Sequence, residues 1–197
     1  MTSPAEQPRD SLLSQYIASF EKLDEMREFP GIYPIAEALA ISKPDEYGAV
    51  LWRPRRTDPK PELLEPIYAK VPDRFPPLFE RLLLTFRWAE VDLQTYTLLV
   101  NPPGPDLDGF FRGISKDRGL WEALIPAGYL RFAKVPDMDY DPVCFDLNSR
   151  RKNGEMRVVK IDHEEILCNC RVKVVAETAP SFEDLVLQTI NFASAAK

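Results

Sequence analysis

The sequence contains a single histidine, His163, so a reaction that needs an imidazole base would have to use it. Three carboxylates surround it along the chain: Asp162, Glu164 and Glu165. These residues could serve a hydrolase that uses His163 as its base. Side chains that are neighbours at the end of a strand diverge, however, so a surface turn accounts for them equally well. Both interpretations follow from the residues alone.

A second acidic stretch has aspartates at alternate positions: Asp137, Asp139 and Asp141. The opening of a calcium-binding loop has this spacing, but its sixth position is glycine and its twelfth is glutamate. The sequence has Pro142 and Asn148 at those two positions. The pattern therefore favours a solvated acidic turn over a calcium site.

The cysteines do not have the spacing of a metal site. Cys168 and Cys170 are predicted to project from the same face of a strand, and a zinc ion would need two further ligands. Nothing in the spacing brings Cys144 to them, and a buried cysteine usually acts as a small hydrophobic residue. Glycine-rich phosphate loops, nucleophile elbows and Ser–His–Asp motifs are not found in the sequence. We therefore expect a non-enzymatic protein with no metal, no cofactor and no catalytic residues.

The composition is that of a folded protein, with 45% hydrophobic and 28% charged residues. The net charge of −6 argues against nucleic-acid binding and favours a basic partner. The N-terminal residues are polar, unlike a secretory signal, and no apolar run approaches the roughly 20 residues that cross a bilayer. Three cysteines without a disulfide framework fit a reducing compartment. We expect a cytoplasmic protein that does not bind membranes.

The C-terminal half has the pattern of an antiparallel meander. Three apolar runs of strand length, at residues 128–135, 143–147 and 156–161, are separated by turn-rich links. The middle run alternates, which predicts that one of its faces packs inward. The pair Asn153-Gly154 supplies a residue that tolerates positive φ before the third strand. A fourth strand is predicted over residues 168–174, with Cys168, Cys170, Val172 and Val174 on one face.

Helices and further short strands are predicted around this sheet. Helical spacing and proline positions indicate helices at residues 11–27, 33–41, 63–68, 77–88 and 110–125. Short strands are predicted at residues 47–52 and 90–100, with a rigid proline-rich loop at 101–105. Ser181 and Asp184 resemble a capping box that begins a final helix. The apolar side of that helix would contain Phe182, Leu185, Val186, Thr189 and Phe192.

Several of these segments together resemble the SUKH superfamily, which contains yeast cell-wall-synthesis regulators and many bacterial relatives. The order and spacing agree over roughly residues 75–190. Residues 75–83 resemble the leading helix of that family, and residues 133–147, ending on Phe145-Asp146, resemble its central turn and strand. Residues 158–164 are similar to its next strand, and residues 180–185 to its closing helix.

The resemblance implies an α+β fold in which helices flank an antiparallel sheet, and it implies a role in binding. It divides the chain into an N-terminal tail and helical extension, residues 1–45, and a SUKH-like domain, residues 46–197. Bacterial members of the family look like immunity proteins that neutralise toxin domains, often nucleases, by direct binding. Eukaryotic members look like signalling adaptors, which is the alternative function. A hydrolase using His163 is the third.

An acidic surface is the predicted binding site for a basic protein partner such as a toxin domain. Charge complementarity speeds the encounter of two proteins and rejects wrong partners. The same residues could instead be ordinary solubilising charge. The candidate protein-binding residues are Asp106, Asp108, Asp137, Asp139, Tyr140 and Asp141.

Overall fold

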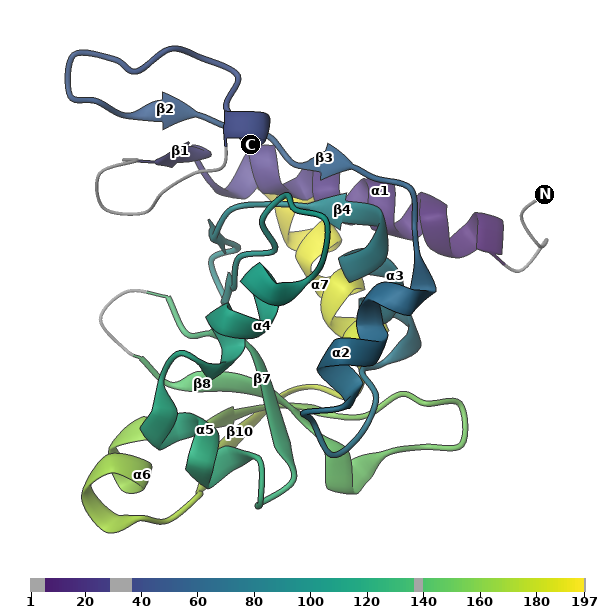
Figure 1. Ribbon diagram of the computed structural model, residues 1–197, viewed down its shortest axis with the longest axis vertical. Coiled ribbons are helices and arrows are strands. Elements are labelled where there is room, and N and C mark those ends of the chain that lie inside the picture. Colours follow the sequence, from purple (N-terminus) through teal and green to yellow (C-terminus); the bar gives the residue numbers. More distant parts are fainter. Residues whose placement is uncertain (1–5, 29–36, 137–139, 197) are drawn as a thin grey trace.

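The centre of the fold is a six-stranded antiparallel sheet with the strand order β10-β9-β8-β7-β6-β5 (Figure 1). The structure is a computed structural model, and it describes residues 6–28, 37–136 and 140–196. Helices flank the sheet, so the predicted α+β class and the antiparallel meander of the C-terminal half are confirmed. The strands are β5 Val91–Asp92, β6 Thr97–Leu98, β7 Tyr129–Lys134, β8 Pro142–Asp146, β9 Val158–Ile161 and β10 Val174–Ala179.

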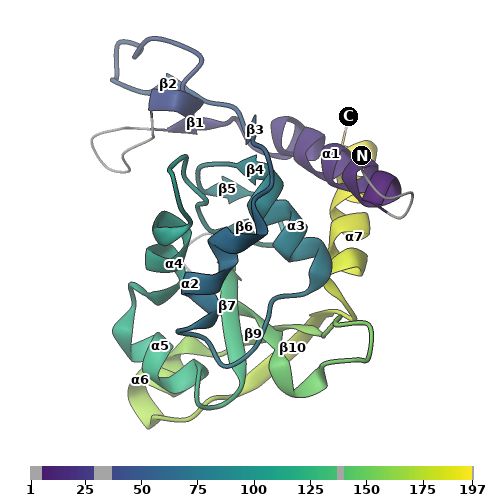
Figure 2. The same cartoon turned by 45° about the vertical axis from the view of Figure 1, so that its right-hand side comes forward.

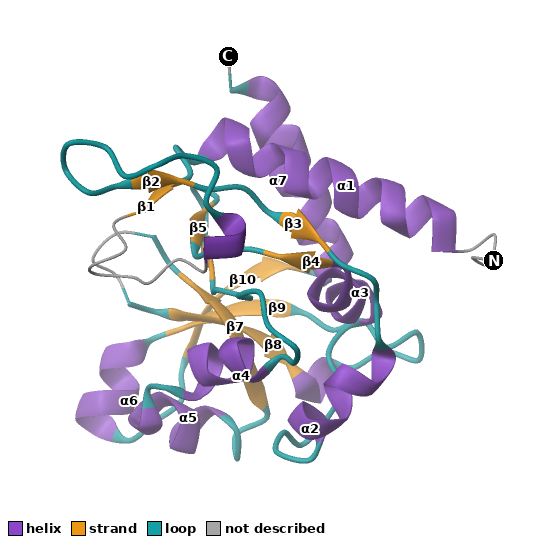
Figure 3. Ribbon diagram, turned by 45° about the horizontal axis from the view of Figure 1, so that its top comes forward, coloured by secondary structure: helices purple, strands orange, loops and turns teal. Residues whose placement is uncertain are grey.

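Helices lie on both sides of the main sheet (Figure 3). Within the described part of the chain, none of the helices is both long and apolar enough to cross a membrane. The α-helices are α1 Glu6–Leu23, α2 Glu65–Tyr68, α3 Pro77–Thr85, α4 Asp108–Ser115, α5 Arg118–Leu124, α6 His163–Asn169 and α7 Phe182–Ala195. Short 3₁₀ turns are η1 Glu37–Leu39, η2 Pro61–Leu64 and η3 Leu147–Ser149.

Strand β8, the middle strand of the predicted meander, is buried on both of its faces. The sequence predicted that one face of this strand packs inward, whereas in the structure both faces do. Phe145 belongs to the main core, whereas Cys144 belongs to a second, smaller cluster on the opposite side of the sheet. Both sides of β8 are buried because helices cover the sheet on both faces, and polar alternation is lost in such strands.

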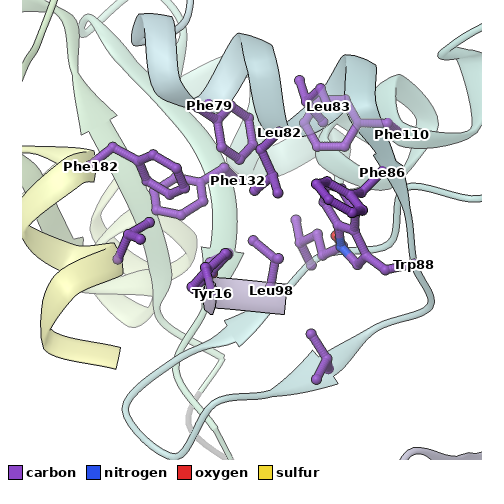
Figure 4. Packing of buried hydrophobic residues seen from close by; sticks show 14 of the residues in the cluster. Tyr16, Phe79, Leu82, Leu83, Phe86, Trp88, Leu98, Phe110, Phe132 and Phe182 are labelled. Atoms are coloured by element: carbon purple, nitrogen blue, oxygen red, sulfur yellow. The ribbon is translucent and has the colours of Figure 1, made fainter. Parts of the chain in front are cut away.

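The main core is aromatic and lies between the sheet and helices α1, α3 and α7 (Figure 4). The rings of Phe132 on β7 and Phe145 on β8 stack, with centroids 4.1 Å apart. Phe79 of α3 and Phe182 of α7 meet edge to face, with centroids 5.1 Å apart. Ser181 caps α7 by accepting a hydrogen bond from the backbone N–H of Asp184, which confirms the predicted start of this helix.

Helix α1 is part of this core. The Tyr16 and Tyr96 hydroxyls lie 2.7 Å apart, and the Tyr96 hydroxyl lies 3.1 Å from that of Thr189 on α7. Tyr16 and Phe20 are completely buried, so residues predicted to form an N-terminal extension pack against the sheet domain. The helix ends at Leu23, four residues earlier than predicted; it is followed by β1, Arg27–Glu28.

Helices α5 and α6 cover the other face of the sheet. Their apolar side chains pack on β8 and β9 in a small cluster that contains no aromatic ring among its fully buried members. That cluster consists of Leu120, Leu124, Cys144, Val159, Ile161 and Ile166. The two faces of the sheet therefore differ greatly in the amount of apolar surface they bury.

The predicted fourth strand at residues 168–174 is wrong, because the stretch begins at the end of α6 and only Val174 lies in a strand. The side chain of Asp162 accepts a hydrogen bond from Glu165 N–H and caps α6, whose first turn is acidic, as the helix dipole favours. Cys170, with φ of 50°, ends the helix in the left-handed conformation. The strand that pairs with β9 is β10, which begins only at Val174.

Other predicted elements are divided in the structure. The single strand predicted at 90–100 is a hairpin of β5 and β6, because Gln94 has a φ of 70° and reverses the chain. The single helix predicted at 110–125 is α4 and α5, separated where Asp117 caps α5. The helix predicted to reach residue 88 ends at Thr85. Of the helix predicted at 33–41, residues 33–36 lie outside the described residues, and the following turn is η1.

Two further strand pairs lie outside the main sheet: β1 with β2, Val50–Leu51, and β3, Arg55–Arg56, with β4, Phe86–Arg87. The β1–β2 pair and the loop before β2 project beyond the body of the protein (Figures 1 and 2). The strand predicted at residues 47–52 is confirmed at Val50 and Leu51, which form β2. Strand β3 lies in the short basic stretch at residues 53–56.

Candidate functional site

A cavity of about 430 Å³ opens on the face of the sheet covered by α5 and α6. We call it the Arg131 cavity. Strand β7, the loop between α4 and α5, and the beginning of α6 supply its walls. Its polar lining residues are Glu90, Lys116, Asp117, Arg131, Lys134 and His163, and its apolar lining includes Leu99, Val100, Leu120 and Leu167.

Arg131 is placed there by the alternation of β7. Its neighbours Leu130 and Phe132 are fully buried in the aromatic core, so the side chain of Arg131 lies on the opposite face of the strand. Arg131 is only 9% exposed, and among the described residues its Nε–H has no hydrogen-bond partner. Burial lowers the pKa of this guanidinium, although an arginine keeps its charge in proteins.

Three other charged groups of the cavity, those of Glu90, Lys134 and Asp117, are engaged with partners. The ammonium of Lys134 lies 2.6 Å from a carboxylate oxygen of Glu90. The carboxylate of Asp117 accepts a hydrogen bond from Leu120 N–H, 3.1 Å away, at the start of α5. Glu90 and Asp117 lie near enough to act electrostatically on Arg131, yet across the described residues neither forms an ion pair or hydrogen bond with it.

His163 reaches the cavity from the first turn of α6 and is held by Asp141. Its Nδ1 lies 2.8 Å from Asp141 Oδ1, and its backbone N–H donates to the same oxygen over 2.9 Å. The other oxygen of Asp141 lies 3.0 Å from the ammonium of Lys160. Burial alone would raise the pKa of Asp141, but the hydrogen bonds from His163 and the interaction with Lys160 outweigh it and hold that pKa below its usual value.

Among the predicted binding residues that the structure describes, Tyr140 lines the Arg131 cavity, and Asp106 and Asp108 lie elsewhere. Asp141 is 7% exposed and contacts His163, and the ring of Tyr140, which is 59% exposed, packs edge to face on the same histidine. Asp106 and Asp108 line a different hollow of about 260 Å³, formed by the proline-rich loop and the start of α4. Asp137 and Asp139 lie outside the described residues.

A second surface with binding character lies at the projecting β1–β2 pair. We define the β1–β2 surface by Ile41, Tyr47, Leu51, Glu21 and Glu25. The three apolar side chains are 54%, 72% and 45% exposed, in that order. Ile41 and Leu51 are joined by a backbone hydrogen bond and line a hollow of about 210 Å³ together with the two glutamates.

No protein-family model matches this chain, and no curated protein matches it in sequence. Its candidate sites therefore rest on the geometry of the residues themselves. Within the described ranges, no group of three or more His, Cys, Asp or Glu side chains is placed to hold a metal ion.

Sequence reasoning did not single out Arg131 or the β1–β2 surface. One signal for Arg131 was present: a charged residue interrupts an apolar run on a strand predicted to lie inside the sheet. The signal for the β1–β2 surface was weaker. Exposed apolar residues are common, and only the fold shows that Ile41 and Leu51 lie side by side next to carboxylates.

Proposed function

We propose that this protein is a non-enzymatic binding domain that acts by occupying the surface of a basic partner protein. The β1–β2 surface is the observation that supports this most directly. Ile41 and Leu51 are exposed side by side and share a hollow with two glutamates, and apolar side chains rimmed by polar groups in this way are typical of protein-interaction sites. Tyr47 is the most exposed of the large apolar side chains in the described chain, and tyrosine is enriched among residues that dominate binding energy.

The charge of the β1–β2 surface determines the kind of partner. Glu21 and Glu25 are exposed beside the apolar residues, and the chain as a whole has a net charge of −6. Arg53 lies 2.9 Å from Glu21, but both side chains are at least half exposed, so this pair is weak and easily exchanged for a partner's cation. Negative potential around an apolar centre favours a partner with a basic rim.

The resemblance to the SUKH superfamily specifies this proposal further. An immunity protein of that type would neutralise a toxin domain, such as a nuclease, by covering its surface. Nuclease domains that bind the phosphate backbone are basic, which fits the acidic β1–β2 surface. A signalling adaptor is the alternative, and it would use the same surface without suppressing any toxic activity.

Co-expression with the product of the neighbouring gene tests the immunity role. We expect a 1:1 complex on purification and restored growth of cells that express the toxin domain. A complex without restored growth would favour the adaptor. Repeated isolation of the protein without a partner would contradict both. Deleting residues 1–44 would not separate the two roles, because it removes Tyr16 and Phe20 from the core.

Substitutions on the β1–β2 surface test where the partner binds. Tyr47→Ala and Leu51→Ser should each weaken binding by about tenfold or more, since central interface residues contribute at least that much. Leu187→Ser on α7 is a matched control, because Leu187 and Leu51 are 42% and 45% exposed. Titration calorimetry would measure the affinities. Equal affinities for all variants would place the interface elsewhere.

Hydrolysis is the second candidate function, and one observation favours it. His163 lines the Arg131 cavity, and Asp141 holds its ring in the arrangement that orients a catalytic base. Aryl ester and aryl phosphate hydrolysis by the wild type and by the His163→Ala variant would test it. Activity that the substitution leaves unchanged would eliminate His163 as a base.

A further inference from the structure

We propose that the Arg131 cavity binds a small organic anion that combines a carboxylate or phosphate head with an apolar body. This site is independent of the β1–β2 surface and does not rest on the proposed partner protein. The two hollows have no lining residue in common.

The buried guanidinium of Arg131 is the reason to expect an anion. A buried cation is stable only when a counter-charge and hydrogen-bond acceptors surround it. Arg131 is 9% exposed, and among the described residues nothing accepts a hydrogen bond from it or pairs with it. Since the side chain keeps its charge, the missing acceptor is best supplied by a ligand that enters the cavity.

The carboxylates of the cavity do not fill this role. Glu90 is paired with Lys134, and Asp117 caps α5 through Leu120 N–H. Turning either carboxylate toward Arg131 would break an interaction that now holds it. The guanidinium therefore offers its fork of donors to a planar or tetrahedral oxyanion, which is the ligand chemistry that arginine binds best.

Two further groups can contact the head of such a ligand. His163 uses Nδ1 with Asp141, and across the described chain its Nε2 has no hydrogen-bond partner. Lys116 lines the same cavity and is exposed, so its ammonium adds positive charge at the entrance. We therefore expect the head of the ligand to contact Arg131, with His163 and Lys116 nearby.

The remaining wall is apolar and selects the body of the ligand. Leu120 is almost completely buried, whereas Leu167 and Tyr140 at the opening are each 59% exposed. A volume of about 430 Å³ lies within the range of roughly 300–1,000 Å³ that is usual for small-molecule sites. An aromatic or branched aliphatic group would cover Leu167 and Tyr140, which a bare inorganic ion cannot do.

Titration of the full chain with four probes tests this inference: phenyl phosphate, benzoate, inorganic phosphate and benzyl alcohol. We expect one or both aryl anions to bind, and more tightly than inorganic phosphate or the uncharged alcohol. Phenyl phosphate alone would identify a phosphate head, and benzoate alone a carboxylate head. Failure of both aryl anions to bind at millimolar concentration would overturn the proposal, as would equal affinity for benzyl alcohol.

Substitution of Arg131 supplies the matched comparison. Arg131→Met should weaken binding of the aryl anion by about tenfold or more, because hydrogen bonds to charged groups contribute that much. Arg112→Met changes an exposed arginine on α4 that does not line the cavity, and it should leave the affinity unchanged. Equal effects of the two substitutions would contradict the site.

Nuclear magnetic resonance of the wild type gives a second test that does not depend on the folding of any variant. The Nε–H signal of Arg131 should shift when the aryl anion is added, while that of Arg112 should not. An Arg131 signal that stays in place during a titration that saturates the protein would show that the anion binds elsewhere, and the proposal would fail.

Discussion

The two faces of strand β7 differ in what surrounds them. On one face, Phe132 stacks on Phe145 within a core of interlocking rings supplied by α3 and α7. On the other face, Arg131 lies beside a cavity of about 430 Å³ under the shorter helices α5 and α6. The adjacent residues Arg131 and Phe132 thus lie in different environments: Phe132 in a closely packed apolar core and Arg131 beside a polar cavity.

We infer that the aromatic face stabilises the fold and that the Arg131 face is suited to binding. The aromatic face excludes water and contains the largest fully buried side chains, so it contributes most of the apolar burial that favours folding. The Arg131 face buries a charged group that has no ion pair or hydrogen bond among the described residues, which opposes folding. A fold can tolerate such a group where the opposite face is stable enough, and groups of this kind are concentrated at functional sites.

The largest effect is expected on the aromatic face. Phe79 is fully buried, and its ring centroid lies within 5.9 Å of those of five other phenylalanines. Phe79→Ala should lower the free energy of unfolding by about 3–5 kcal/mol, since it removes apolar contacts and leaves a cavity. Urea unfolding would measure the change.

The control for Phe79→Ala is Phe192→Ala on α7. Phe192 was predicted on the apolar side of the final helix, but it is 47% exposed. Its substitution should change the free energy of unfolding by less than about 1 kcal/mol. Equal losses for the two variants would mean that the aromatic face is not the main source of stability.

The aromatic face was largely predictable from the sequence. Period-two runs and a capped amphipathic helix indicate β7, β8, β9 and α7, because strands and helices with one apolar side leave a local trace. The cover of the other face was not predictable in the same way. Residues 168–174 alternate like a strand, yet the cap at Asp162 and the left-handed Cys170 make α6 and its ending turn. Asp162 is a typical helix-capping residue, so the start of α6 had a local signal in the sequence. The alternation at residues 168–174 predicted a strand instead.

The site was harder to predict because its character depends on distant residues. Whether Arg131 is paired is decided by Glu90, Asp117 and His163, which are brought to it only by the sheet and two helices. The acidic residues were visible in the sequence, but Asp141 is used inside the fold by Lys160 and His163. Composition shows how many charges a chain has, and tertiary packing decides which are free to bind.

A smaller effect is expected from the ion cluster that holds the Arg131 face. Asp141→Asn should lower the free energy of unfolding by about 1–3 kcal/mol at pH 7, because it removes the charged acceptor of His163 and Lys160. The pKa of Asp141 is lowered by folding, so its contribution is present above the unfolded value of about 3.9 and is lost as pH falls through the folded value. Urea unfolding at pH 7 and pH 3 would show the difference between variant and wild type narrowing in acid.

Asp58→Asn is the matched change for Asp141→Asn. Asp58 is exposed, and no hydrogen bond or ion pair of its side chain occurs within the described residues. Its replacement should alter the free energy of unfolding by less than about 0.5 kcal/mol at either pH. If Asp141→Asn were as mild, or if its effect persisted undiminished at pH 3, the carboxylate would not be an organising charge of this face.

The smallest effect should have the opposite sign. Arg131→Met replaces a buried charge, which has no ion pair among the described residues, by an apolar side chain, and in the absence of ligand it should raise the free energy of unfolding by about 1 kcal/mol. Lys134→Met on the same strand removes a paired charge and leaves Glu90 without its partner, so it should be neutral or slightly destabilising. Urea unfolding of both variants measures this contrast within one strand. If Arg131→Met lowered stability more than Lys134→Met, the guanidinium would already be compensated inside the folded chain, and the cavity would have no need of an anion.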